Sequence, residues 1–312
     1  MYGLLLVALS VAPALAFLVL ILRMDRAEPE PLREVLRTVG LGAAAALAAA
    51  LVEMALERLP VFHAEGLAGA AATAFLQAAP VEELAKLGVV LLFVWNRPSF
   101  NEENDGVVYV GAAAIGFAVL ENITYVVSNG YGTGVLRAFT AIPLHVFTAV
   151  IMGLFVGRAK FAGTAAARGT LVVGGLLIAW AFHGAYDTLA FSGGALSLLL
   201  LPLLGGLVAL GIMALRRGRG LSLRRWAGAS PVPVPPHRAA GTRGHRWMPI
   251  LSRSLFVLCA LFWALLLFGS AGGGGDVATT AAGGVLITVL PLGMAVLTET
   301  AWQRRRRRNA GG

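Results

Sequence analysis

Charged residues are scarce in this sequence, and their scarcity decides the broad class of protein. Asp, Glu, Lys and Arg together make up 13% of the 312 residues, whereas 58% are hydrophobic. Soluble domains carry about 25% charged residues. Several apolar runs are longer than the roughly 18 residues that a helix needs to cross a bilayer. The composition therefore excludes an ordinary soluble protein and predicts a multi-pass membrane protein.

Cysteine is nearly absent, and the sequence lacks two common hydrolase motifs. The single cysteine, Cys259, lies inside an apolar run, which excludes a disulfide framework and a cysteine-based zinc site. Neither HExxH nor GxSxG occurs, so zincin and serine-hydrolase mechanisms are excluded by motif. The 25 basic residues outnumber the 16 acidic ones, but they are spread over loops between apolar runs. This spacing argues against nucleic acid as a partner and favours a bilayer.

Apolar runs predict an all-α, polytopic transmembrane bundle of about nine spans, because backbone exposed to lipid must be hydrogen-bonded within its own segment. Residues 1–215 are expected to form a seven-span core. A basic, Pro-rich cytoplasmic loop at 216–249, a two-span appendage at 250–303 and an Arg-rich tail at 304–312 are expected to follow. The expected spans are 2–22, 38–56, 67–95, 106–128, 137–157, 169–190, 195–215, 250–270 and 279–303.

The distribution of basic residues predicts the orientation of these spans. With the N-terminus outside, all but three of the 25 Lys and Arg residues fall on the cytoplasmic side or its edge. The exceptions are Arg58 and Arg137 outside and Lys86 within the membrane. No basic residue precedes the first run, which favours an anchor over a cleaved signal peptide. We therefore expect a cell-membrane protein with its N-terminus outside and its C-terminus in the cytoplasm.

A charged stretch interrupts the third apolar run. Glu82, Glu83 and Lys86 are the charges there, and each costs about 2.5–3.5 kcal/mol at bilayer depth on insertion scales. Their i,i+3 and i,i+4 spacings place all three on adjoining faces of a helix. Lys86 neutralises one glutamate, so the other needs a second partner or a proton. Pro80 is expected to open the helix and free backbone carbonyls. A buried ion pair that only fixes helix packing is the alternative interpretation.

Four more polar residues lie within later spans, at a similar depth below the outer surface. They are Glu121, His145, His183 and Asp187. Carboxylates and imidazoles suit hydrolysis by either of two routes. In one, zinc is held by candidate ligands Glu121, His145 and His183. In the other, glutamate and histidine activate a water without a metal, and the residues alone do not separate the two.

The ordered set of motifs resembles the PrsW family of intramembrane proteases, distant relatives of the CAAX prenyl endopeptidases. The resemblance covers about residues 1–215 and departs from the prenyl endopeptidases at Glu121, where they have histidine. Its motifs are Glu82-Glu83-x-x-Lys86, Asp105-Gly106 with Tyr109, Gly116-Phe117-x-x-x-Glu121-Asn122-x-x-Tyr125, Arg137 with His145-x-x-Thr148, and His183-x-x-x-Asp187.

The resemblance implies roles for individual residues. Glu82 or Glu83 would activate the water and Lys86 would balance their charge, while His183 with Asp187 would complete the site. It also implies a membrane-protein substrate of the anti-sigma-factor type.

Two other functions remain open from the sequence. A proton-coupled transporter would use Glu82, Glu121 and His145 as a relay, although no internal repeat supports it. A non-catalytic scaffold would use the same groups to pack helices. Glu102, Glu103 and Asp105 are expected in a solvated loop at the inner membrane edge.

Overall fold

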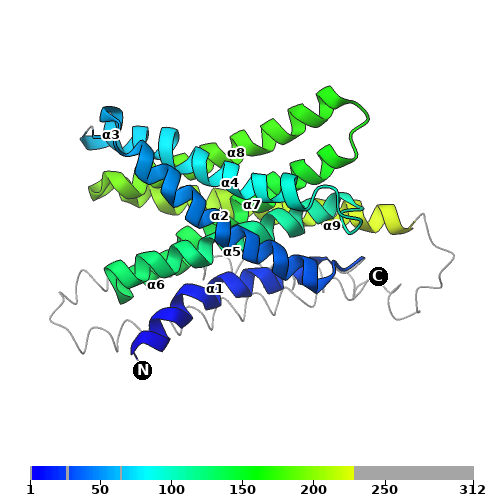
Figure 1. The fold of residues 1–312 in the computed structure, drawn as a ribbon, viewed down its shortest axis with the longest axis horizontal. Coiled ribbons are helices and arrows are strands. Elements are labelled where there is room, and N and C mark those ends of the chain that lie inside the picture. Colours follow the sequence, from blue (N-terminus) through cyan, green and yellow to red (C-terminus); the bar gives the residue numbers. More distant parts are fainter. Residues whose placement is uncertain (1, 26–27, 64, 228–312) are drawn as a thin grey trace, which may run out of the picture. The chain divides into compact units, whose positions relative to one another are not determined.

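The computed structural model describes residues 2–25, 28–63 and 65–227, and every regular element in this part of the chain is helical (Figure 1). The expected spans at 250–270 and 279–303, and the tail, lie outside the described residues. The elements are α1 (Tyr2–Met24), α2 (Leu32–Leu56), η1 (Pro60–His63), α3 (Gly66–Ala72), η2 (Thr73–Ala78), α4 (Ala79–Phe93), α5 (Glu103–Asn129), α6 (Tyr131–Phe139), α7 (Ala141–Lys160), α8 (Ala165–Ser192), η3 (Gly194–Leu199) and α9 (Leu200–Ala227).

Five helical segments of the described chain are long and apolar enough to cross a membrane. They are Leu32–Leu56, Glu103–Asn129, Tyr131–Lys160, Ala165–Ser192 and Gly194–Trp226. The helical, multi-pass class is thus confirmed, while a total of nine spans stays a prediction. Several boundaries differ from the expected ones, and one changes the interpretation of a segment. Helix α9 continues past Leu215 to Ala227, so the basic segment predicted to begin as a loop at 216 begins as helix.

Helices α5 and α7 form the centre of the bundle, where α5 packs against α7, α2 and α1. Small residues allow this close approach. A Cβ atom added at Gly106 would collide with the backbone of Gly153 and Gly157 in α7, and one added at Gly116 would collide with Val39 in α2. Only a residue without a side chain fits at Gly116, so this glycine sets how closely α5 approaches α2.

The third span changes from α-helix to a π-helical turn immediately before its charged stretch, while its backbone stays helical. Residues Thr73–Ala78 form a π-helical turn, and α4 begins after it with Pro80 in its first turn. Proline has no backbone N–H and cannot continue the regular ladder. The carbonyl oxygen of Phe75 accepts a hydrogen bond from Trp180 Nε1 at 2.8 Å. Glu82 and Glu83 therefore lie in the early turns of α4, directly after the π-helical turn. Helix α8 supplies the donor for the Phe75 carbonyl within that turn.

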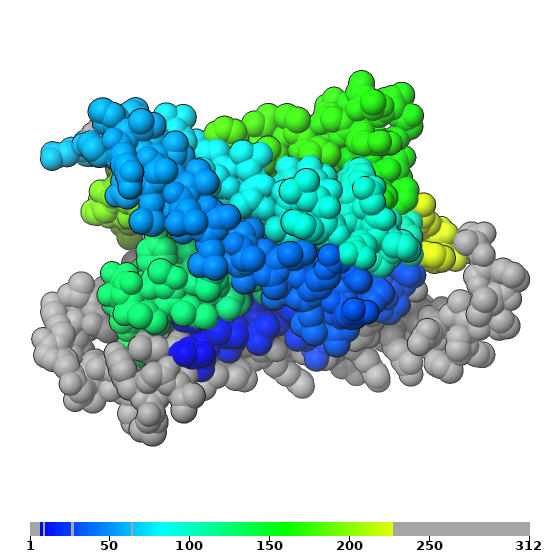
Figure 2. Space-filling view, viewed as in Figure 1, coloured from blue at the N-terminus to red at the C-terminus, as the bar shows by residue number. Residues whose placement is uncertain are grey.

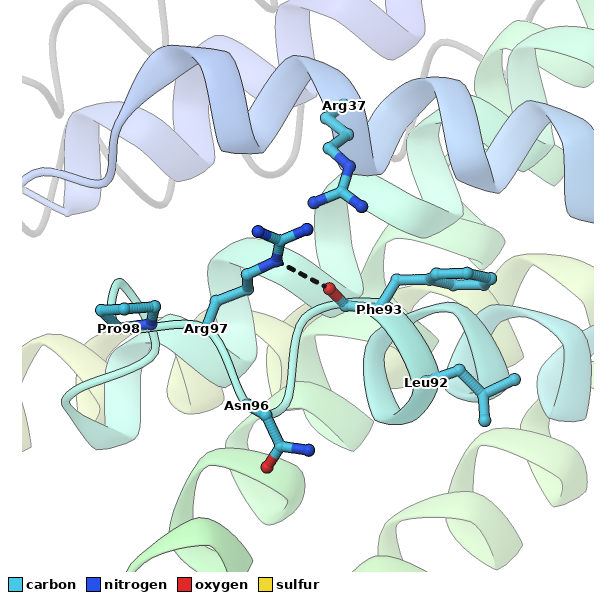
Figure 3. Close-up of a pocket in the computed structure, with 6 residues that line it drawn as sticks. All are labelled: Arg37, Leu92, Phe93, Asn96, Arg97 and Pro98. Atoms are coloured by element: carbon cyan, nitrogen blue, oxygen red, sulfur yellow. Dashed lines mark hydrogen bonds between the residues drawn. The ribbon is translucent and has the colours of Figure 1, made fainter.

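The charged stretch is buried, because Glu83 and Lys86 are 0% exposed and Glu82 is 6% exposed. Figure 2 shows the segments from α2 to α4, coloured blue to cyan, as a diagonal band across the face in view. A surface pocket of about 370 Å³ lies between the start of α2 and the end of α4 (Figure 3). It is lined by Arg37, Leu92, Phe93, Asn96, Arg97 and Pro98. None of the predicted site residues lines this pocket, so the chemistry belongs to the buried polar groups.

Candidate active site

Lys86 is the centre of a buried polar cluster that includes both glutamates of its own helix. Its Nζ atom lies 2.7 Å from Glu83 Oε1 and 3.3 Å from Glu82 Oε2. The side chains of Lys86 and Glu83 are fully buried, and that of Glu82 is 8% exposed. The ammonium also lies 4.6 Å from the centre of the Phe117 ring. The spacing argument is confirmed, because one lysine contacts both carboxylates.

His145, from the first turns of α7, joins this cluster through both of its ring nitrogens. Its Nδ1 atom lies 2.9 Å from Lys86 Nζ, and its Nε2 atom lies 2.7 Å from Glu121 Oε2. A lysine ammonium only donates, so Nδ1 accepts from Lys86 and Nε2 carries the hydrogen that faces Glu121. His145 is thereby held as the neutral ring with a defined tautomer.

His183, from α8, lies between carboxylates. Its Nδ1 atom is 2.8 Å from Glu83 Oε1, and its Nε2 atom is 3.3 Å from Asp187 Oδ2. Asp187 follows one turn later on the same helix and orients the ring, as its i,i+4 spacing predicts. The rings of His145 and His183 lie 5.2 Å apart and nearly perpendicular. Both imidazoles therefore face the same small volume beside Glu82.

Glu121 is held by an arginine from outside its own helix. Arg137, on the short helix α6, lies 2.7 Å from Glu121 Oε1 through a terminal guanidinium nitrogen. The Arg137 Nε atom donates to Asn122 Oδ1 at 2.8 Å, and the guanidinium stacks 3.9 Å from the ring centre of Tyr125. These contacts fix the side of Glu121 that faces away from His145.

Glu82 faces both imidazoles without touching either. Its Oε2 atom lies 3.8 Å from His145 Nδ1 and 3.8 Å from His183 Nε2. These separations are too long for direct hydrogen bonds and suit an atom placed between the groups. One oxygen of Glu82 and one nitrogen of each histidine all lie within 4.8 Å of one another. This Glu-His-His group is placed to bind a metal ion.

Comparison with known families identifies the class of protein. Residues 30–215 match the model of the PrsW family intramembrane metalloprotease. The chain belongs to the PrsW family. The Protease PrsW of Geobacillus kaustophilus is 38% identical over 185 residues, which are 59% of this chain and 79% of that protein. The Protease PrsW of Bacillus subtilis is 30% identical over 181 residues, which are 58% of this chain and 80% of that protein. No solved structure matches the chain.

Membership of the PrsW family confirms the expected resemblance and makes this chain a multi-pass intramembrane protease. The structure brings together every residue that the sequence singled out for the site: Glu82, Glu83, Lys86, Glu121, His145, His183 and Asp187. In the group placed to bind a metal, however, Glu82 stands with the two histidines, where the sequence predicted Glu121.

Arg137 is the residue whose role the sequence analysis missed. Charge counting placed it on the outer side of the membrane, and its motif position carried no assigned contact. In the structure its side chain is only 13% exposed and pairs with Glu121. The available signal was the unpaired glutamate within span four, which required a cation from another segment.

Proposed function

We propose that this PrsW-family chain is an endopeptidase that hydrolyses a peptide bond of a membrane-anchored protein, with Glu82 as the group that activates water. The 3.8 Å separations between Glu82 Oε2 and the two imidazoles carry this proposal. A water between them would touch a proton acceptor and lie beside ring nitrogens. Glu83 instead holds Lys86 and His183 in place, since its Oε1 atom contacts both of them.

The proposed reaction uses groups that already face one another. Water attacks the peptide carbonyl carbon as Glu82 accepts one of its protons. The C–N bond then breaks, and the departing amine takes a proton from His183, which lies between Glu83 and Asp187. The proton held by Glu82 then returns to His183, whose Nε2 atom lies 3.8 Å from Glu82 Oε2, and both groups recover their starting state. Lys86 stabilises negative charge that develops next to Glu82. Glu121 and Arg137 hold His145 in the orientation that closes this pocket.

A metal would fit the donor set that the structure brings together. Glu82, His145 and His183 supply one carboxylate and two imidazoles, the kinds of ligand that zinc takes in catalytic sites. A bound zinc ion would polarise the carbonyl and lower the pKa of water. Lys86 occupies His145 Nδ1 in this arrangement, so the lysine and a metal compete for that nitrogen. The metal-containing and the metal-free glutamate mechanism therefore differ in the position of Lys86.

The proposed substrate is a single-span membrane protein of the anti-sigma-factor type, as the family resemblance implies. With the predicted orientation, Glu121 and Arg137 lie on the outer side of the bundle. Their side chains are 19% and 13% exposed, more than those of the other cluster members. We therefore propose that the substrate approaches from the extracytoplasmic side, past Arg137.

The experiment is co-reconstitution of the purified protein with a single-span anti-sigma factor in liposomes, with fragments followed by electrophoresis and mass spectrometry. Glu82→Ala, Glu83→Ala and His183→Ala are each expected to abolish cleavage. Glu34→Ala is the control, because Glu34 pairs only with exposed Arg37 in the described structure. Normal cleavage by all three site variants would remove the proposed centre.

Metal analysis of the same preparations addresses the mechanism. Wild-type protein is expected to retain about one zinc per chain, and His145→Ala and His183→Ala to lose it, because each removes one imidazole ligand. Protein that is active and metal-free would instead assign activation of water to Glu82 alone.

A further inference from the structure

A second group of buried acids lies at the opposite end of α5 from the active site. Asp105 stands near the start of α5, about 24 Å along the helix from Glu121 at the usual rise of about 1.5 Å per residue. Asp25, Glu28 and Glu30 come from the segment between α1 and α2, and Glu102 precedes α5. Glu102 and Asp105 are 0% exposed. The expectation of a solvated acidic loop at 102–105 is wrong for these two residues.

These carboxylates converge in two overlapping sets. One oxygen from each of Asp25, Glu102 and Asp105 lies within 4.8 Å of the others, and the same holds for Glu28, Glu30 and Asp105. Asp105 belongs to both sets and joins them. Two segments that are distant in the sequence thus place five carboxylates in one largely buried region.

Several of these oxygens accept no hydrogen bond. Asp105 Oδ2 accepts from the backbone N–H groups of Asn101 and Glu102 at 2.6 and 2.7 Å, but its Oδ1 atom is buried without a partner. One oxygen each of Glu28, Glu30 and Glu102 is likewise buried and unpartnered. The Glu30 and Asp105 carboxyl groups interact with each other, and Glu102 interacts with Ser222, but these contacts use only part of the acceptor capacity of the cluster. Buried polar atoms are normally satisfied, so the remaining capacity points to a further ligand.

Helix capping at the start of α5 explains only part of this arrangement. Glu102 and Asp105 form a capping box at the start of α5, which accounts for one side of Asp105 and for an acid at a helix N-terminus. It does not account for Asp25 and Glu30, which accept hydrogen bonds from neutral groups: Asp25 from Asn104 and a backbone N–H, and Glu30 from Tyr109. The capping box therefore does not explain why carboxylates from the α1–α2 segment converge on Asp105.

We propose that Asp25, Glu28, Glu30, Glu102 and Asp105 form a binding site for a hard divalent cation, Mg²⁺ or Ca²⁺, separate from the active site. Both ions prefer oxygen ligands and are bound by converging carboxylates. The site would tie the α1–α2 segment to the start of α5. It would also reach α9, because Trp226 Nε1 donates to Glu102 at 2.5 Å. The ion has a structural role here, since no active-site residue contributes to it.

The test is a Mn²⁺ titration of the full-length, chelator-treated protein in detergent, followed by electron paramagnetic resonance and competition with Mg²⁺ and Ca²⁺. The Glu82→Gln variant is expected to bind about one competable Mn²⁺ per chain, because this substitution removes an active-site ligand and leaves the acidic cluster intact. Adding Glu30→Gln or Asp105→Asn is expected to weaken that binding by at least about tenfold, the smallest loss usual even for an outer partner of a metal ligand.

Glu103→Gln is the matched control, because Glu103 lies between Glu102 and Asp105 in sequence but pairs with Arg225. It should leave the affinity unchanged. Glu28→Gln replaces Asp105→Asn as the test variant if Asp105→Asn disturbs the start of α5, because Glu28 lies outside the helices. No saturable binding, or equal binding by Glu30→Gln, Glu28→Gln and the control, overturns the cation site and leaves the proposed protease centre untouched.

Discussion

Replacement of Lys86 by methionine tests whether the buried pair holds the active site together. Lys86 and Glu83 are fully buried 2.7 Å apart, and the same ammonium contacts Glu82 and His145. Removing one partner of a buried pair typically costs about 3–5 kcal/mol, because the other charge is left unpaired. We therefore expect Lys86→Met to lower the free energy of unfolding by about 3–5 kcal/mol and to abolish cleavage.

The chain provides a matched control for this substitution. Arg37 and Glu34 have the same i,i+3 spacing, but their side chains are 40% and 24% exposed. Exposed helical pairs are worth only about 0.3–0.5 kcal/mol, so Arg37→Met should be nearly silent. The double variant Lys86→Met/Glu83→Gln should lose less stability than Lys86→Met, since the buried negative charge is also removed.

Both free energies are measured by denaturant unfolding of the purified protein in detergent micelles, followed by circular dichroism. Equal losses for Lys86→Met and Arg37→Met would refute the reasoning. So would a double variant that is less stable than Lys86→Met alone, because it would show that Glu83 is not left as an uncompensated charge.

Three further predictions address the arginine contact, the helix packing and the metal. Arg137→Ala should lower kcat by about 100-fold, which is the usual cost of a small misplacement of a catalytic group. Arg137→Lys should recover part of this activity. Full activity of the alanine variant would contradict a positioning role for the Arg137–Glu121 contact. Gly116→Val should destabilise the bundle by at least about 1–3 kcal/mol in unfolding assays, because a Cβ atom there collides with Val39. Gly40→Val serves as control, because a Cβ atom at Gly40 meets no atom within 4 Å. Dialysis against a chelator should abolish cleavage in the liposome assay and zinc should restore it; activity that survives complete metal removal would favour the metal-free glutamate mechanism.

Much of the site could be predicted where the governing geometry is local. Glu82, Glu83 and Lys86 meet because residues three and four apart share a helical face. Asp187 contacts His183 for the same reason. The positions of Glu121, His145 and His183 along their spans also predicted that they lie at one depth in the membrane. In the structure His145 contacts Glu121 and Lys86, and its ring lies 5.2 Å from that of His183. Each of these inferences needs only the helical repeat and the position of a residue along its span.

Contacts that depend on how helices are turned toward one another could not be predicted in this way. Depth alone did not show that Glu82, and not Glu121, stands with both histidines. Nor did it show that Arg137 reaches Glu121 from α6. Asp105 and Glu102 read as loop residues because nothing in their local sequence reveals the segments that cover them.

The sequence by itself determined that this chain is a helical membrane protein and which polar residues are costly enough to need partners. It could do so because apolarity and helical periodicity act within a segment. Only the tertiary structure decided which partners meet, since the rotation of each helix about its axis is set by packing against distant segments. Contacts such as that between Gly116 and Val39 therefore determine where the carboxylates and imidazoles converge.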